Sequence, residues 1–166
     1  IDLDKDNMEL FKIYRPKDYN ICAAISDEIK ETDLFFYHPK SALNTIDKKT
    51  SNYQKAKVTS LKKIETTTLN DVLNKSIYNS SKIDFLSIDV EGSELSVLKN
   101  FNFKKYEPKV IVVEYLDLSL KKLEIKNLNI QNAINSEIYK LITSKNYTLA
   151  NMVHSDLVFI YNDFRD

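Results

Sequence analysis

Residues 82–101, KIDFLSIDVEGSELSVLKNF, decide how the rest of the chain folds. An apolar run ends at Ile88 and is followed by Asp89, Glu91 and Gly92, the only glycine among 166 residues. Apolar side chains then recur at helical spacing, which predicts a buried strand, a tight turn and a helix. Open α/β sheets bind ligands at the carboxyl ends of their strands, so both acids are candidate site residues. They would equally serve as simple helix caps. A lone glycine at the turn indicates a positive φ or a close approach by another group.

The composition is that of an ordinary globular protein of one domain. Lys plus Arg and Asp plus Glu number 24 each, so the zero net charge indicates neither a nucleic-acid partner nor a charged membrane surface. Cys22 is the single cysteine, which excludes an internal disulfide framework and fits a reducing compartment. Its place in an apolar stretch predicts a small core residue. No membrane span or signal-peptide pattern is visible, so we expect a cytoplasmic protein.

The hydrophobic pattern predicts alternating strands and helices. The expected strands are 1–3, 19–25, 33–39, 58–65 (near a sheet edge), 83–88, 110–116, 147–154 and 156–162, and the expected helices are 7–15, 69–78, 93–101 and 129–146. Such alternation predicts a mainly parallel sheet with helices on both faces. The two successive strands at the end predict an antiparallel hairpin.

Two segments carry a weaker signal. Residues 41–57 are polar and loop-like, and such a segment either contacts an acceptor substrate or is simply solvated. Residues 119–129 alternate Leu and Lys and fit either a loop or a short helix.

The motifs resemble one known family. IDFLSIDVEGSELSVLKNF at 83–101, followed by YEPKVIVVE at 106–114, resembles the FkbM-type S-adenosylmethionine-dependent methyltransferases. The opening residues 1–26, TTTLNDVL at 66–73 and NYTLANMVHSDLVFI at 146–160 match as well. The resemblance implies the α/β fold of class I methyltransferases, which is Rossmann-like, mainly parallel and closed by an antiparallel last strand. It also implies one methyltransferase domain over 1–166 and S-adenosylmethionine as the cofactor.

The resemblance assigns cofactor contacts to acids at strand ends. In this fold the acid that ends the second strand binds the ribose hydroxyls, and Asp2 matches it. A carboxylate can accept two hydroxyl hydrogen bonds at once. Asp4 is the second choice, because a first-turn helix acid would look the same. Ser26 and Asp27, which follow the next expected strand, complete the expected cofactor set.

One departure from the family pattern concerns the start of the chain. The resemblance implies a first strand and a glycine-rich turn ahead of Ile1, and the sequence contains neither. We therefore expect a partial domain, truncated at its N-terminus and lacking that strand and turn. We expect residues 1–166 alone to bind S-adenosylmethionine poorly or not at all.

Methyl transfer to a hydroxyl requires alignment of donor and acceptor and removal of a proton. Asp89, Glu91 and Glu114 follow two strands that we expect to be neighbours, about 4.8 Å apart. Close carboxylates raise one another's pKa, so that one can act as a base. His154, in the expected hairpin turn, is a further candidate base because an ordinary histidine titrates near neutral pH. The alternatives are a helix cap or ion pair for Glu114 and a solvated turn for His154.

The expected function is O-methylation of a hydroxyl on a sugar, a glycan or a related small molecule. We expect no resident metal ion, although Asp89 and Glu91 with Glu114 or Asp117 could bind a divalent cation. The alternative functions are a metal-dependent glycosyltransferase and a truncated remnant without catalytic activity. The sequence leaves the acceptor and the oligomeric state open.

Overall fold

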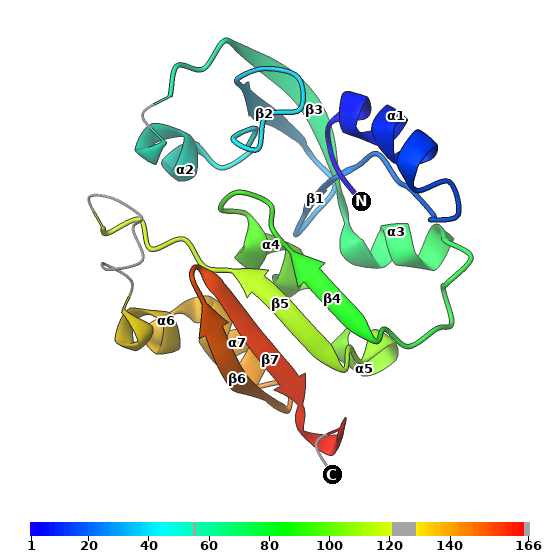
Figure 1. The fold of residues 1–166 in the computed structure, drawn as a ribbon, viewed down its shortest axis with the longest axis vertical. Coiled ribbons are helices and arrows are strands. Elements are labelled where there is room, and N and C mark those ends of the chain that lie inside the picture. The colour runs from blue at the N-terminus through cyan, green and yellow to red at the C-terminus, as the bar shows by residue number, and fades with distance from the viewer. Residues whose placement is uncertain (55, 121–128, 165–166) are drawn as a thin grey trace.

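The computed structural model describes residues 1–54, 56–120 and 129–164, and it divides the strands between two sheets (Figure 1). The first sheet has the order β1 (Ala24–Ser26), β3 (Ser60–Thr68), β2 (Glu31–Phe36). The second has the order β4 (Phe85–Ile88), β5 (Val110–Glu114), β7 (Asp156–Tyr161), β6 (Tyr147–Val153). The fold is mixed α/β, as the alternation of elements predicted.

The prediction of one mainly parallel sheet is wrong. Parallel pairing joins β1 to β3 and β4 to β5, whereas β2–β3, β5–β7 and β6–β7 are antiparallel. A parallel connection needs a helix that crosses back over the sheet. The chain between β2 and β3 instead leaves the sheet to contact the turn after β4, and β3 returns antiparallel to β2. β3 is consequently the central strand of its sheet and not an edge strand.

The helices are short, and most begin at a side-chain cap. Their bounds are α1 Lys5–Tyr14, α2 Lys48–Tyr53, α3 Leu69–Lys75, α4 Glu94–Lys99, α5 Phe103–Tyr106, α6 Ile130–Asn135 and α7 Glu137–Thr143, with a 3-10 turn η2 at Asn162–Phe164. Asp4 caps α1 and Thr68 caps α3. α2 lies within the segment 41–57, which was predicted as a loop. Its first turn is stabilised by Asp47, whose Oδ1 accepts from Thr50 N at 2.6 Å.

The predicted helix 129–146 is interrupted. Ser136 is both the last cap of α6 and the first cap of α7, with an extended backbone and its hydroxyl accepting from Tyr139 N at 3.1 Å. Serine competes for backbone hydrogen bonds in this way and so favours a helix start over a helix interior. The prediction for 119–129 falls largely on residues 121–128, which lie outside the described part of the chain.

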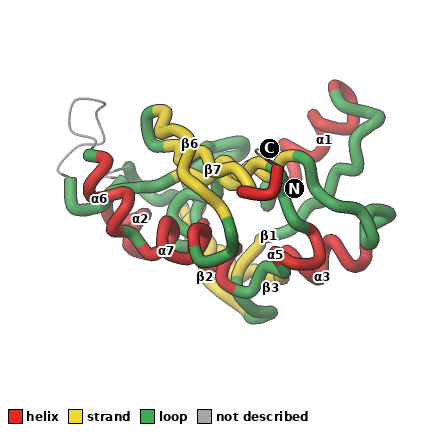
Figure 2. The backbone as a smooth tube through the Cα atoms, turned by 90° about the horizontal axis from the view of Figure 1, so that it is seen from below, coloured by secondary structure: helices red, strands yellow, loops and turns green. Residues whose placement is uncertain are grey.

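The main core lies between the second sheet and the helices behind it. α5 and α7 lie on the same side of this sheet in Figures 1 and 2. The side chains that carry this core are fully buried: Leu98, Tyr106, Ile111, Val113, Ile142, Leu157 and Phe159. The opposite face bears the partly exposed Val112, Val158 and Ile160. The expected burial of both sheet faces is therefore not found, and β5 and β7 alternate as half-buried strands do.

The two sheets share no strand. β4 is an outer strand of the second sheet. Residues Ile1–Leu3 do not form the expected strand: Asp2 makes an isolated parallel bridge to Cys22, which lies just before β1. Within the described residues no strand pairs with the free edge of β4. Cys22 is exposed and not the core residue that we expected.

The first sheet and the second sheet define two halves of the molecule. Between these halves, Asn100 Nδ2 donates to the Asp27 carbonyl oxygen at 2.8 Å. Among the described helices none is long and apolar enough to cross a lipid bilayer.

Candidate active site

The turn after β4 is built around positive φ angles. Glu91 has φ 55° and Gly92 has φ 96°. A Cβ on Gly92 would lie 1.9 Å from Thr50 Oγ1 of α2. Both requirements that the sequence predicted for the lone glycine, a positive φ and a close approach, are thus confirmed.

The segment around α2 holds this turn from the first half of the molecule. Thr45, which is fully buried, donates its hydroxyl hydrogen to the Glu91 carbonyl oxygen at 2.7 Å. Gln54 Nε2 donates to Glu91 Oε2 at 3.0 Å. Residues 41–57, left open between acceptor contact and solvated loop, thus support the acidic turn directly.

Three predicted catalytic acids meet at the carboxyl ends of β4 and β5. Carboxylate oxygens of Asp89, Glu91 and Glu114 all lie within 4.8 Å of one another. Burial raises the pKa of Glu91 to about 7, and the charges of Asp89 and Glu94 contribute to that shift. Burial, followed by the charges of Asp89, Glu91 and Glu94, raises the pKa of Glu114 to about 8. Glu114 Oε2 is buried and has no hydrogen-bond partner within 1–54, 56–120 and 129–164.

This acidic cluster, Asp89, Glu91 and Glu114, can do two kinds of chemistry. Carboxyl groups whose pKa is raised to near neutral pH can take up a proton from a substrate. The same three oxygens could also ligate a divalent cation, although such an ion normally needs more ligands.

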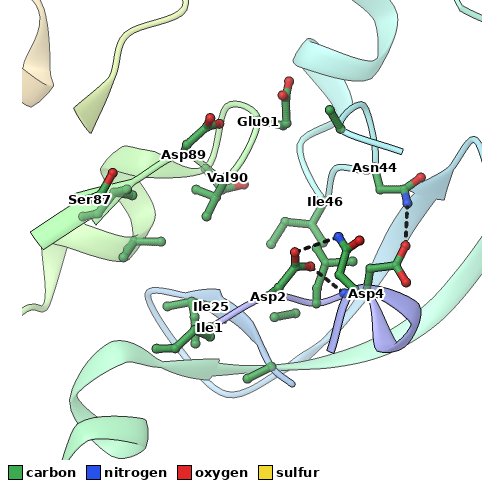
Figure 3. Close-up of a pocket in the computed structure, with 18 of the residues that line it drawn as sticks. Ile1, Asp2, Asp4, Ile25, Asn44, Ile46, Ser87, Asp89, Val90 and Glu91 are labelled. Atoms are coloured by element: carbon green, nitrogen blue, oxygen red, sulfur yellow. Dashed lines mark hydrogen bonds between the residues drawn. The ribbon is translucent and has the colours of Figure 1, made fainter. Parts of the chain in front are cut away.

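A pocket of about 440 Å³ opens beside the cluster, between the two halves. Asp2 and Asp4 lie on one wall, and Asp89 and Glu91 lie on the facing wall (Figure 3). Apolar side chains between these walls include Ile25, Leu69, Ile88 and Val97. The volume is that of a small-molecule site, and so is the combination of an apolar lining with a few polar groups.

Asp2 is the acid best placed to receive a ligand in this pocket. Its Oδ1 accepts from Asp4 N at 2.7 Å, and its Oδ2 accepts from Asn7 Nδ2 at 2.9 Å. A carboxylate has about four lone-pair sites, so two remain for hydroxyl donors. Asp4 is more occupied, since it caps α1 and its Oδ2 also accepts from Lys40 N at 2.7 Å.

Other predicted site residues lie elsewhere. Ser26 and Asp27 do not line the pocket; the Ser26 hydroxyl donates to Asp27 at 3.1 Å. Burial opposes ionisation of Asp27, but Ser26 and Lys30 outweigh it and lower its pKa. His154 is exposed in the β6–β7 turn and lies outside the acidic cluster. Asp117 accepts from Asn132 Nδ2 at 2.7 Å and likewise lies outside the cluster.

Three contributors to the site were missed at the sequence level: Asn7, Gln54 and Glu94. Asn7 and Gln54 are single amides in polar stretches, and nothing in their spacing marks them. Glu94 stands at a polar position of the expected helix 93–101, yet it is only 2% exposed. Its position two residues after the lone glycine was the available signal.

The structure is a mixed α/β fold with acids gathered at its strand ends, which is consistent with a methyltransferase-like fold. A family model described as the methyltransferase FkbM domain matches residues 4–149. The chain therefore belongs to the FkbM methyltransferase family. Searches of the curated proteins and of the solved structures found no match.

Proposed function

We propose that the protein is an S-adenosylmethionine-dependent O-methyltransferase, a single domain that uses the pocket between its two halves. The observation that carries the proposal is the pairing of Asp2 with the acidic cluster across this pocket. Membership of the FkbM family supports it. The acceptor is a hydroxyl of a sugar, a glycan or a related small molecule.

The pocket suits the cofactor in size and chemistry. Asp2 would accept the ribose hydroxyls with the lone pairs that Asp4 and Asn7 leave free. The apolar side chains of Ile25 and Ile88 would contact uncharged parts of the molecule. Bound S-adenosylmethionine would supply an electrophilic methyl group on a positively charged sulfur.

The acidic cluster would handle the proton of the acceptor hydroxyl. As the oxygen gains the methyl group it must lose its hydrogen, and a carboxylate of Glu91 or Glu114 would take it. Their pKa values of about 7 and about 8 are close to neutral, where a base is most effective. The rate is expected to rise with pH through this range, because only the ionised carboxylate accepts a proton.

The first test is isothermal titration of S-adenosylmethionine into the natural gene product. Asp2→Asn should weaken binding about tenfold or more, since charged hydrogen bonds contribute about 1.5–3 kcal/mol. Asp6→Asn is the matched control, because Asp6 is an exposed acid of α1 that does not line the pocket. Equal affinity in the wild type and Asp2→Asn would contradict the assignment of Asp2. Absence of binding to the natural gene product would contradict the cofactor.

Activity is measured as release of S-adenosylhomocysteine with a panel of hydroxylated sugars. Glu114→Gln should slow turnover while leaving S-adenosylmethionine affinity nearly unchanged, because Glu114 does not line the pocket. Loss of activity on chelation would assign the acidic cluster to a cation in place of a base. Binding of a uridine-diphosphate sugar without any methyl transfer would favour the glycosyltransferase alternative.

A further inference from the structure

Glu94 is an unusual acid for its position in the chain. It is the first residue of α4, where an acidic side chain normally remains in solvent and interacts favourably with the positive end of the helix dipole. Glu137, the first residue of α7, does so and is exposed. Glu94 is only 2% exposed, and glutamate is almost never this buried unless its carboxyl group has partners.

The partners of Glu94 are backbone groups of the acidic turn. Its Oε1 accepts from Val90 N at 3.0 Å and from Gly92 N at 3.1 Å. These two N–H groups belong to the residues on either side of Glu91, whose φ is 55°. A left-handed backbone costs a residue with a side chain about 1–2 kcal/mol, so something must hold Glu91 in that conformation.

We propose that Glu94 is a positioning residue, whose carboxyl oxygen draws in Val90 N and Gly92 N and so holds Asp89 and Glu91 against Glu114. The catalytic part of this inference rests on the proposed function, in which the three acids handle the acceptor proton. The positioning itself concerns only the shape of the turn. Side chains held by buried hydrogen bonds are what keeps a site within its productive geometry.

An ordinary capping role would place the hydrogen bonds differently. Ser93, the cap residue of α4, makes no side-chain cap hydrogen bond. Glu94 Oε1 reaches back to the turn before the helix, where it accepts from Val90 N and Gly92 N. Its contacts therefore serve residues 89–92 more than α4.

The charge of Glu94 has a second effect on the cluster. It is one of the causes that raise the pKa of Glu91 and of Glu114. The other groups that face Glu91 are Asp89 on its own turn and Glu114 at the end of β5. At the end of α2 the neutral amide of Gln54, its C-cap residue, donates a hydrogen bond to the Glu91 carboxylate. Position and charge can thus be separated by substitution.

Two substitutions separate them in the unliganded protein, with Glu137→Gln and Glu137→Leu as matched controls at the other helix start. In Glu94→Gln the amide oxygen still accepts from both N–H groups, but the charge is gone. Hydrogen exchange at Val90 and Gly92 should stay slow, and the pKa of Glu91, followed by NMR of its carboxyl carbon, should fall. In Glu94→Leu the acceptor is also lost, and exchange at both amides should accelerate about tenfold, the equivalent of one hydrogen bond.

Kinetics of the natural gene product add a second measurement. A purely structural role of Glu94 would not lower kcat while leaving KM unchanged. Glu94→Leu should lower kcat about a hundredfold, the typical effect of misplacing a catalytic group by about 1 Å. The KM for S-adenosylmethionine should change little, because Asp2 lies on the other wall, and Glu94→Gln should restore most of kcat.

Unchanged exchange in Glu94→Leu would overturn the positioning role, whereas an unchanged Glu91 pKa in Glu94→Gln would overturn only the electrostatic effect of Glu94 on the cluster. Both NMR measurements are independent of methyl transfer. A protein that transfers no methyl group would therefore refute the proposed function alone, whereas wild-type kcat in Glu94→Leu would refute this inference alone.

Discussion

Ionisation of the buried acids of the site lowers the stability of the folded protein at high pH. Glu91 and Glu114 have pKa values of about 7 and about 8, above the ordinary value of 4.5, and burial is the first cause for both. The folded protein therefore binds their protons more tightly than the unfolded chain. Their contribution to stability is fully present below about pH 4.5 and is lost as the pH rises through 7 and 8.

Substitution Glu114→Gln should flatten this pH dependence. The free energy of unfolding of the wild type should fall between pH 5 and pH 9, and that of the variant should fall less. Above pH 8 the variant should be more stable by on the order of 1 kcal/mol, a value reduced for the partial exposure of the group. Urea unfolding at several pH values measures this. Parallel curves for the two proteins would contradict it, and Glu137→Gln, at an exposed acid, serves as the control.

At the residue scale the sequence predicted the acids that meet and missed the groups that hold them. Asp89, Glu91 and Glu114 could be predicted because each stands where an apolar run ends, and strand ends converge at one edge of a sheet. Gln54 reaches Glu91 across 37 positions of the chain, and no local pattern encodes such a contact. The buried state of Glu94 depends on the shape of the turn that it holds.

At the scale of elements, α2 packs tightly against the turn after β4. Gly92 faces Thr50 so closely that no β-carbon fits between them. Thr50 is 1% exposed, and its hydroxyl oxygen has no hydrogen-bond partner among the residues that the structure describes. The steric and the conformational costs of a side chain at position 92 can therefore be measured separately.

Gly92→Ala should destabilise the protein by about 3 kcal/mol or more, the sum of a positive φ and a clash. Thr50→Ala alone should cost less, because the hydroxyl that it removes makes no hydrogen bond. In the double variant the clash with Oγ1 disappears, so the two costs should not add, and the coupling energy should exceed about 0.5 kcal/mol. Urea unfolding of the four proteins closes the cycle. Strict additivity would show that α2 does not press on the turn.

The elements within residues 82–101 and the terminal pair of strands were the most predictable. β4, α4 and the terminal pair β6 and β7 follow from hydrophobic spacing and short connections. α2 was not predicted because its residues, KKTSNY, carry no apolar stripe, and packing on the turn supplies the burial of Thr50 and Ser51. Ser136 divides a helix whose apolar spacing continues through it, since capping depends on backbone geometry more than on hydrophobic period.

For the whole molecule, hydrogen bonds join the first sheet and its connections to the second. Thr45 donates to the Glu91 carbonyl at 2.7 Å across this boundary. Thr143 makes a comparable bond to the Tyr139 carbonyl at 2.8 Å, but within α7. The same substitution, Thr→Val, can therefore be compared at Thr45, whose bond joins the two halves, and at Thr143, whose bond lies within one helix.

Thr45→Val should lower the free energy of unfolding by about 1–3 kcal/mol, because it removes a buried donor from a carbonyl oxygen. It should also weaken the binding of S-adenosylmethionine, since the proposed site has a wall in each half. Thr143→Val should lower stability by less and leave binding unchanged. Unfolding curves and titration calorimetry on both variants decide the matter, and equal effects on binding would contradict a site between the halves.

The topology was the least predictable level. The alternation of strands and helices correctly indicated an α/β fold, but strand direction depends on where each connection goes after leaving the sheet. Residues 37–59 leave β2, contact the acidic turn and return, and nothing in their composition reveals that destination. The placement of β7 between β5 and β6 agrees with the predicted hairpin and makes most of the second sheet antiparallel.

The close contact at Gly92 also has a genetic consequence. Every glycine codon begins with two guanines, so a change at either base replaces glycine with a residue that carries a side chain or creates a stop codon. Each such residue would bring a Cβ to 1.9 Å from Thr50 Oγ1 at a φ of 96°. The codon of the chain's only glycine therefore has no neutral amino-acid replacement within one base change, and only its third base is free to drift.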